Sequence, residues 1–269
     1  MPDDVPLPPL VDLLWGRTSK ARRGPKPELT VDRIVETAIS VADADGLAAV
    51  SMARVAEELG FTTMSLYRHV PSKDDLLALM AEGATPSPDD LPDARVVGWR
   101  AASHAWCLIQ WDLLHRRPWL TEVAVPSISM PGPRRLDWID RGLAALEPTG
   151  LDPGTRFALM GLMSQHVLGE ARLRLDLARA ATAAATAYGL APEDAAAATN
   201  PFAMFDLALS RLADPERYPA VVRAMAEGAL EPDGQWQETE QELRAGVEFG
   251  LAVLLDGIEA LVALAGRGG

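Results

Sequence analysis

The feature that most restricts the fold of this chain is a small residue, a glycine and an apolar residue at fixed spacing. Gly60 follows Ala56 by four residues, and Leu66 follows Ala56 by ten. Where two short helices meet at a tight turn, their contact needs a small side chain, the turn needs a residue that tolerates positive φ, and an apolar side chain must fill the gap. With Ser51 as the N-cap of the first helix, the pattern predicts a helix-turn-helix over residues 51–69. The spacing alone is also compatible with a plain helical hairpin.

Helical periodicity recurs along the whole chain, and no run alternates apolar and polar residues cleanly enough to predict a strand. An N-cap at Thr30 and a stop at Gly46 predict one more helix before the helix-turn-helix, and Ser72 begins another after it. Residues 84–93 are rich in Pro and Asp and predict a connector. Beyond it, the pattern predicts helices at about 95–115, 133–147, 153–180, 204–212 and 237–265. The predicted fold class is therefore all-α.

Charge is distributed unevenly along the chain. The 25 basic and 38 acidic residues give a net charge of −13, which argues against a general nucleic-acid binder. Residues 15–27 nevertheless carry five basic side chains and no acidic one. Such an arm ahead of a helix-turn-helix can enter the adjacent minor groove or touch phosphates without sequence preference, and a solvated basic tail is the alternative. The candidate DNA contacts in the arm are Arg17, Arg22, Arg23 and Lys26.

The second helix of the predicted helix-turn-helix carries compact polar side chains on its exposed surface. Its first residues are expected in the major groove, where base edges specify sequence, and the residues that follow are expected at phosphates. The expected base-reading residues are Thr62, Thr63 and Ser65, with Met64 as a further candidate. Tyr67, Arg68, His69 and Lys73 follow them, and Ser51 and Arg54 at the start of the first helix complete the predicted DNA-binding set.

These residues form a family pattern. The stretch LTVDRIVETAISVADADGLAAVSMARVAEELGFTTMSLYRHVPSKDDLLALM, residues 29–80, closely resembles the N-terminal domain of TetR (tetracycline-repressor-like) family transcriptional regulators, and MSLYRHVPSKDDLL is its most specific part. The resemblance implies an all-α homodimer that binds a palindromic operator and releases it when a small molecule binds. By motif position, Thr62, Thr63, Ser65 and Tyr67 should face DNA, and His69 and Lys73 should lie beside its backbone.

Three later segments resemble the ligand-binding domain of the tetracycline-repressor subgroup. They are HRRPWL at 115–120, GLMSQHVLGEA at 161–171 and VEFGLAVLLDGI at 247–258. This resemblance implies a buried ligand cavity and a four-helix dimer interface. The magnesium–drug site of the tetracycline repressor is not readable in these residues, so tetracycline is not implied. The predicted organisation is a flexible N-terminal arm at 1–28, a helix-turn-helix DNA-binding domain at 29–82 and a helical ligand-binding and dimerisation domain at 83–269.

Tryptophan is concentrated in residues 99–119, where four of the seven tryptophans of the chain occur. A tryptophan offers a flat apolar wall and one N–H donor, which suits an aromatic natural product or drug, and methionine adapts to irregular shapes. The candidate ligand-binding residues are His104, Trp106, Gln110, Trp111, Trp138, Met160, Met163 and His166. A stripe of Trp and Met is more often ordinary core, and that interpretation stays open.

The last predicted helix carries a continuous apolar seam. Its apolar residues recur at spacings of four, three and four, which is typical of helices that pack as a coiled coil. A comparable stripe runs along the long helix predicted at 153–180, and two such helices from each subunit can form a four-helix bundle. The predicted dimer contacts are Leu159, Leu173, Val247, Leu251, Leu254 and Ile258. Packing within the subunit's own core is the alternative.

Other classes of function find little support in the sequence. No GxSxG, P-loop, GxGxxG or HExxH motif occurs, so no enzyme is predicted. With four histidines and one cysteine, no metal or cofactor is predicted either. No signal-peptide pattern or uninterrupted apolar span occurs, so a cytoplasmic protein without a membrane partner is expected. The predicted function is a ligand-responsive repressor. An activator, a corepressor-dependent regulator, and an all-α small-molecule-binding protein without DNA function are the alternatives.

Overall fold

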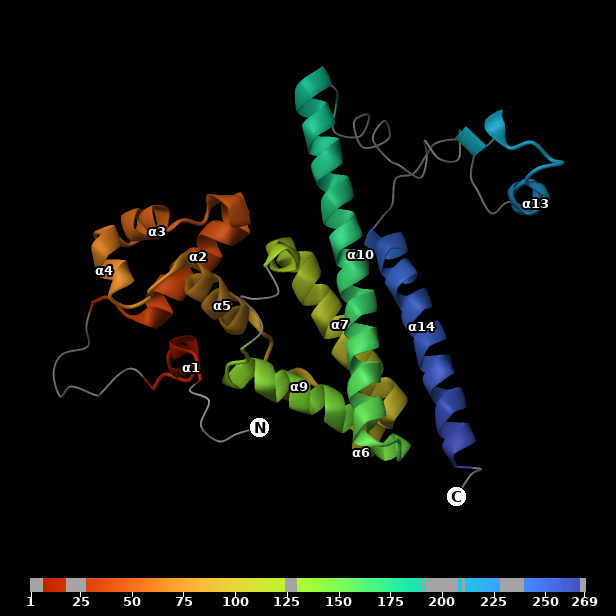
Figure 1. Ribbon diagram of the computed structural model, residues 1–269, viewed down its shortest axis with the longest axis horizontal. Coiled ribbons are helices and arrows are strands. Elements are labelled where there is room, and N and C mark those ends of the chain that lie inside the picture. The colour runs from red at the N-terminus through yellow and green to blue at the C-terminus, as the bar shows by residue number, and fades with distance from the viewer. Residues whose placement is uncertain are drawn as a thin grey trace. The chain divides into compact units, whose positions relative to one another are not determined.

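The computed structural model describes residues 7–17, 28–123, 130–189, 191, 208–209, 211–227 and 240–266. All regular secondary structure in these ranges is helical, which confirms the predicted fold class (Figure 1). Two compact units are present, one of residues 1–168 with 251–269 and one of residues 169–250. The long helices α10 (Pro153–Tyr188) and α14 (Glu240–Ala265) each contribute to both units. Within the described ranges, every helix is too short or too polar to cross a bilayer.

Four helices form the head of the protein, in red to orange in Figure 1. They are α2 (Val31–Asp45), α3 (Met52–Leu59), α4 (Thr63–Tyr67) and α5 (Lys73–Ala84). Helix α2 packs against α3 and α5, and α3 packs against α4. Each helix begins at a hydroxyl side chain that accepts a hydrogen bond from the backbone N–H three residues on, as the sequence predicted for α2, α3 and α5. These N-caps are Thr30, Ser51, Thr62 and Ser72.

A short helix, α1 (Pro9–Leu14), joins the head by packing against α5. The sequence placed these residues in the N-terminal arm and predicted no helix. Val11 and Leu14 are buried, and Leu14 belongs to the same apolar core as the helix-turn-helix. A six-residue helix is not stable in isolation, so its helicity depends on this packing rather than on local propensity.

The rest of the first unit is built from α6 (Ala94–Val97), α7 (Trp99–Arg116), α9 (Pro133–Leu146) and parts of α10 and α14. Helix α7 packs against α6, α9 and the short 3₁₀ helix η3 (Pro118–Glu122). The single helix predicted at 95–115 is divided at Gly98, whose φ of 84° lies outside the helical region. The predicted boundary after residue 82 lies inside this unit.

The second unit differs from the prediction in the length of its first helix. Helix α10 continues through an alanine-rich stretch to Tyr188, beyond the predicted end at about residue 180. Alanine has the highest helix propensity, which accounts for the extension. Helix α13 (Pro219–Ala226) was not predicted. The helix predicted at 204–212 lies mostly outside the described residues.

Candidate nucleic-acid interface and effector region

The turn between α3 and α4 has the geometry that the sequence spacing predicts. Gly60 adopts the left-handed conformation, with φ 75° and ψ 27°. Its N–H donates to the carbonyl of Glu57 at 3.0 Å, and the N–H of Phe61 donates to the carbonyl of Ala56 at 2.9 Å, which closes α3 in a Schellman motif. Leu66 is fully buried between the two helices. The predicted helix-turn-helix is therefore confirmed, and a plain hairpin is not needed to explain the spacing.

Four of the predicted DNA-binding residues on and beside α4 are exposed to solvent. Thr62, Tyr67, Arg68 and Lys73 are exposed, and Thr63, Ser65 and His69 are partly buried. The Thr62 hydroxyl accepts from the N–H of Ser65 at 3.3 Å, and the two hydroxyl oxygens are 2.9 Å apart. The pair therefore closes the first turn of the helix as well as lying on its surface.

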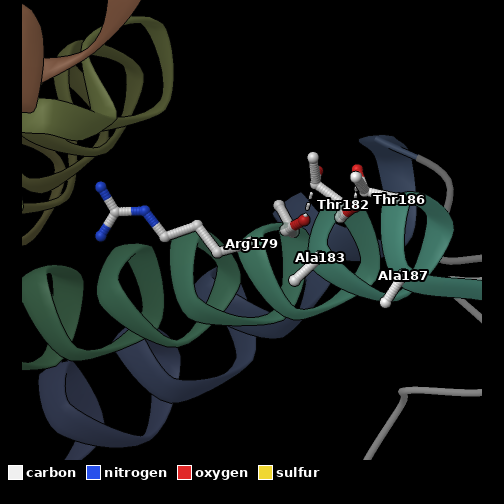
Figure 2. A pocket seen from close by; sticks show the side chains of 6 residues that line it. Arg179, Thr182, Ala183, Thr186 and Ala187 are labelled. Carbon is white, nitrogen blue, oxygen red and sulfur yellow. Dashed lines mark hydrogen bonds between the residues drawn. The ribbon is translucent and has the colours of Figure 1, made fainter.

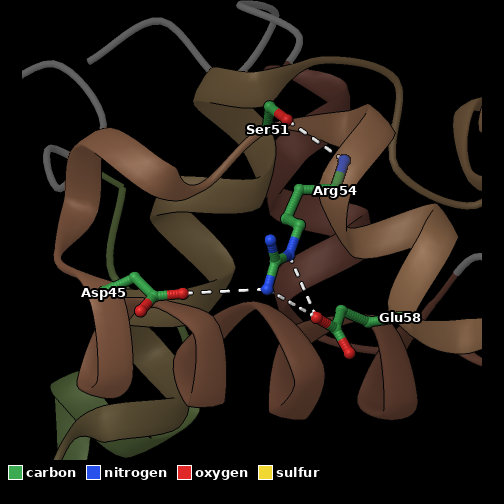
Figure 3. A network of polar contacts seen from close by, with 4 residues as sticks. All are labelled: Asp45, Ser51, Arg54 and Glu58. Atoms are coloured by element: carbon green, nitrogen blue, oxygen red, sulfur yellow. Dashed lines mark hydrogen bonds and ion pairs between the residues drawn. The ribbon is translucent and has the colours of Figure 1, made fainter.

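The start of α3 carries a small polar network (Figure 3). Ser51 Oγ accepts from the backbone N–H of Arg54 at 3.1 Å. The Arg54 guanidinium lies 2.8 Å from Glu58 and 3.7 Å from Asp45, and its Nε donates to the same Glu58 oxygen at 3.0 Å. All three charged side chains are about half exposed, so the ion pairs contribute little stability. For Arg54 to contact DNA, as predicted, its guanidinium must leave these carboxylates.

The N-terminal arm is described only as far as residue 17. Arg17 is exposed, and its guanidinium carbon lies 5.5 Å from the centroid of the Trp15 ring in a cation–π contact. The other predicted contacts of the arm, Arg22, Arg23 and Lys26, lie outside the described residues.

The predicted effector residues lie on α7, α9 and α10, and some of them are in contact. Trp106 stacks on Trp138 with ring centroids 5.6 Å apart and planes 20° apart, and its Nε1 donates to the Trp138 carbonyl at 3.1 Å. Gly142 lies so close to Trp106 and Met160 that a Cβ there would meet both. All three large side chains are buried, so they form core in this state, which is the alternative that the sequence left open.

Several polar side chains lie among these apolar residues. Ser164 Oγ donates to Gln110 Oε1 at 2.9 Å and joins α10 to α7. Trp111 is buried and stacks on His115 at 6.0 Å. Met163 is buried, and His104 and His166 are partly buried. Ser103 of α7 was not predicted, yet its hydroxyl is buried without a hydrogen-bond partner among the described residues. A buried, unpaired hydroxyl is unusual and favours contact with a ligand group or water.

A shallow depression lies elsewhere, along α10 within the second unit (Figure 2). It is lined by Ala178, Arg179, Thr182, Ala183, Thr186 and Ala187. The Thr182 hydroxyl donates to the Ala178 carbonyl at 2.9 Å, and the Thr186 hydroxyl donates to the Thr182 carbonyl at 3.0 Å. Because these donors serve their own helix, the depression presents mainly methyl groups. It contains none of the predicted effector residues.

Comparison with known proteins covers nearly the whole chain. Residues 34–80 match the family described as "Bacterial regulatory proteins, tetR family", and residues 91–262 match "Tetracyclin repressor-like, C-terminal domain". The chain belongs to the TetR family. Both parts of the sequence resemblance are thereby confirmed, and the protein is a DNA-binding regulator and not an enzyme.

Individual relatives agree with this TetR-family assignment. The HTH-type transcriptional repressor DrrR1 of Streptomyces coeruleorubidus is 36% identical over 256 residues, which are 94% of this chain and 86% of the relative. The TetR family protein ActR of Streptomyces coelicolor, in complex with actinorhodin, has a TM-score of 0.64 and 25% identity, over 86% of this chain and 96% of ActR. BioQ of Mycobacterium smegmatis has a TM-score of 0.53 and 19% identity, over 86% of this chain and 99% of BioQ, and shows the fold alone.

The predicted dimer contacts of this TetR-family chain are mostly buried inside the chain itself. Leu159, Val247, Leu251 and Ile258 are all buried within the chain, which favours the alternative of packing in the subunit's own core, and their role as partner contacts stays a prediction. Leu173 is exposed and Leu254 is partly buried.

Helix α14 carries a second apolar face. Val253 is 56% exposed and Leu264 is 63% exposed. At 3.6 residues per turn, Val253 lies about 160° around the helix from Leu251, and Leu264 lies about 120° from Ile258. The period-of-seven seam therefore marks the inward face of the helix, and the apolar face that the chain leaves uncovered is a different one.

Hydrogen bonds join the head to η3 and to the first turn of α9. Trp119 is buried in the head core, and its Nε1 donates to Asp43 of α2 at 2.7 Å, while Arg117 Nε donates to the same carboxylate at 3.1 Å. Glu82 of α5, only 7% exposed, accepts from the backbone N–H groups of Arg134 at 2.7 Å and Arg135 at 3.3 Å. Burial lowers the pKa of the Arg135 guanidinium, and the charge of Glu82 opposes that shift. Sequence patterns gave no signal for either link.

Cys107 is a free cysteine in the interior of the protein. The thiol is fully buried in α7, and burial raises its pKa to about 12. A thiol that stays protonated in the physiological range is a small hydrophobe rather than a redox sensor.

Proposed function

We propose that this regulator is a repressor that binds a palindromic operator as a homodimer in the cytoplasm and releases it when an aromatic small molecule binds. The observation that carries the proposal is the intact helix-turn-helix, whose second helix exposes Thr62, Tyr67 and Arg68 beside Lys73. The similarity to a repressor, DrrR1, supports the sign of regulation.

Operator binding is tested by reversing charge on this surface. The variant with Arg68→Glu and Lys73→Glu should lose binding to DNA from upstream of the gene, because both side chains lie where phosphates are expected. Arg95→Glu is the matched control, since Arg95 is exposed on α6 outside the head. Binding is measured over about 50 to 200 mM salt, where phosphate contacts are evident. Operator binding that survives the double reversal would place the interface elsewhere.

The exposed apolar face of α14 supports the homodimer. A two-fold dimer presents two heads to two half-sites about 34–36 Å apart, which matches a palindrome. Val253→Asp with Leu264→Asp should convert the dimer to monomer, because a charge in an apolar interface is left unpaired. Val96→Asp is the control, since Val96 is at least as exposed but lies on α6. The molar mass in solution is read by light scattering, and an unchanged dimer would reject this face.

The effector class is inferred from the region around Trp106 and Trp138. Aromatic walls with a few polar groups, here Ser103 and the Gln110 and Ser164 pair, suit a polycyclic molecule with oxygen substituents. ActR has been crystallised with actinorhodin, which makes actinorhodin a first probe. Its addition should quench tryptophan emission and lower operator affinity. Quenching without loss of affinity would support ligand binding but reject induction.

Induction is a shift between two populations. A ligand that binds the DNA-incompetent conformation more tightly lowers operator affinity by that difference in affinity. The effect of ligand binding must pass from α7 to the head. Trp119 offers a direct route, because it follows α7 in the sequence and is buried in the head core. Helix α5 is a second route through Glu82.

A further inference from the structure

Helix α4 points one apolar side chain directly away from the protein. Leu66 has no exposed surface and anchors the helix to the head, whereas Met64 is 69% exposed. At 3.6 residues per turn, Met64 lies about 160° around the helix from Leu66. Met64 is therefore the outermost side chain on the face that a DNA groove would meet.

The hydroxyl groups beside Met64 are already occupied. Thr62 Oγ accepts from the Ser65 N–H, and the Thr62 and Ser65 hydroxyls bond each other at 2.9 Å. Thr63 is partly buried. Hydroxyls committed to capping have less capacity to read base edges, so the side chains with the most free surface on this helix decide what it contacts.

A methionine side chain can recognise only one feature of the major groove. It has no hydrogen-bond donor, and its thioether is a weak acceptor. It can therefore bond the donor groups of the bases only weakly and their acceptor groups not at all, but the C5-methyl group of thymine is apolar and projects into the groove. We propose that Met64 reads a thymine methyl group in each half-site of the operator. The proposal rests on the operator binding proposed above and adds a base preference to it.

The test exchanges thymine for deoxyuridine, which removes only the methyl group. Each thymine of a bound operator fragment is replaced in turn, and affinity is measured by fluorescence anisotropy. For the wild-type protein, one position in each half-site should lose about fourfold in affinity, the value for one buried methyl group, and both together about 15-fold. For Met64→Ala, the same replacements should change nothing, although its affinity for the thymine operator is lower.

Two variants serve as controls. Met64→Leu keeps an apolar tip and should retain part of the thymine preference. Val96→Ala shortens an exposed apolar side chain on α6, outside the head, and it should retain the full preference. Because Met64 is exposed, none of these changes disturbs the core, and circular dichroism verifies the fold.

The failures of the two proposals are distinguishable. If wild-type protein binds its operator but tolerates deoxyuridine at every position, operator binding stands and the role of Met64 is rejected. If Met64→Ala still discriminates thymine from deoxyuridine, another side chain reads the methyl group and the proposal is equally rejected. If the wild type binds all DNA fragments alike, the proposed function itself fails.

Discussion

Removal of the Glu82 carboxylate should weaken the junction between α5 and α9. The residue before α9, Gly132, has no side chain to cap the helix, and Glu82 takes this place by accepting from the N–H groups of Arg134 and Arg135. Losing a helix cap costs about 1 kcal/mol, and buried hydrogen bonds to a charged group contribute about 1.5–3 kcal/mol each. Because one of the two bonds is long, we expect Glu82→Ala to lower the free energy of unfolding by about 3 kcal/mol.

Calorimetry or circular dichroism measures this loss directly. For a protein of this size, 1 kcal/mol corresponds to about 2–4 °C, so Glu82→Ala should melt roughly 6–12 °C below the wild type. Glu82→Gln keeps one acceptor oxygen and should lose about half as much. Glu36→Ala is the control, since Glu36 is an exposed glutamate on α2, and its change should stay within about 0.5 kcal/mol.

A second substitution makes the test specific to this contact. A methyl group on Gly132 would overlap the Glu82 carboxylate, so Gly132→Ala should displace it and destabilise the protein in turn. In the double variant with Glu82→Ala the overlap disappears. The loss of stability in the double variant should therefore be clearly smaller than the sum of the losses in the two single variants. Additive losses, or a Glu82→Ala variant as stable as the wild type, would refute the capping argument.

Three further predictions concern other contacts. Cys107, whose pKa is raised to about 12, should not react with a disulfide reagent at pH 8 until the protein unfolds, and rapid labelling of native protein would contradict its burial. Glu58→Gln removes the carboxylate nearest Arg54 and should raise DNA affinity with a steeper salt dependence, whereas unchanged titrations would mean that Arg54 does not reach a phosphate. Trp119→Phe deletes the 2.7 Å bond to Asp43 and should cost about 1–3 kcal/mol, so a melting curve that coincides with the wild type would count against that bond.

The head was predictable from sequence because its determinants are local. A cap acts over three residues and the turn acts over five. The structural roles of Ser51, Ser72 and Gly60 therefore depend only on residues close to them in the sequence. The burial of Leu66 between the two helices could be predicted for the same reason, since Ala56 is only ten residues away in the sequence. The base-reading residues follow from the same geometry and await DNA-binding measurements.

Contacts between distant segments had no such signal. Helix α1 forms because Leu14 packs into a core made of residues much later in the chain. The six residues of α1 are too few to show a periodicity that predicts this helix. Glu82 is one acidic residue among many in the sequence, and only the backbone N–H groups of Arg134 and Arg135 give it a role. The candidate effector region was predictable in part. The composition pointed to its tryptophans, but it did not show that Trp106 and Trp138 pack on each other.

Helix α14 shows why a regular apolar seam does not by itself identify a dimer interface. Leu251 and Ile258 have the spacing of coiled-coil contacts, but the same spacing serves a helix that packs within its own subunit, and both residues are buried there. Arg100 of α7 occupies another side of the helix through Asp256 at 2.5 Å and Glu259 at 3.1 Å. A partner must then use the apolar surface that neither the core nor α7 covers. The exposed fractions of the side chains identify that surface, whereas the seven-residue repeat in the sequence identifies the buried face.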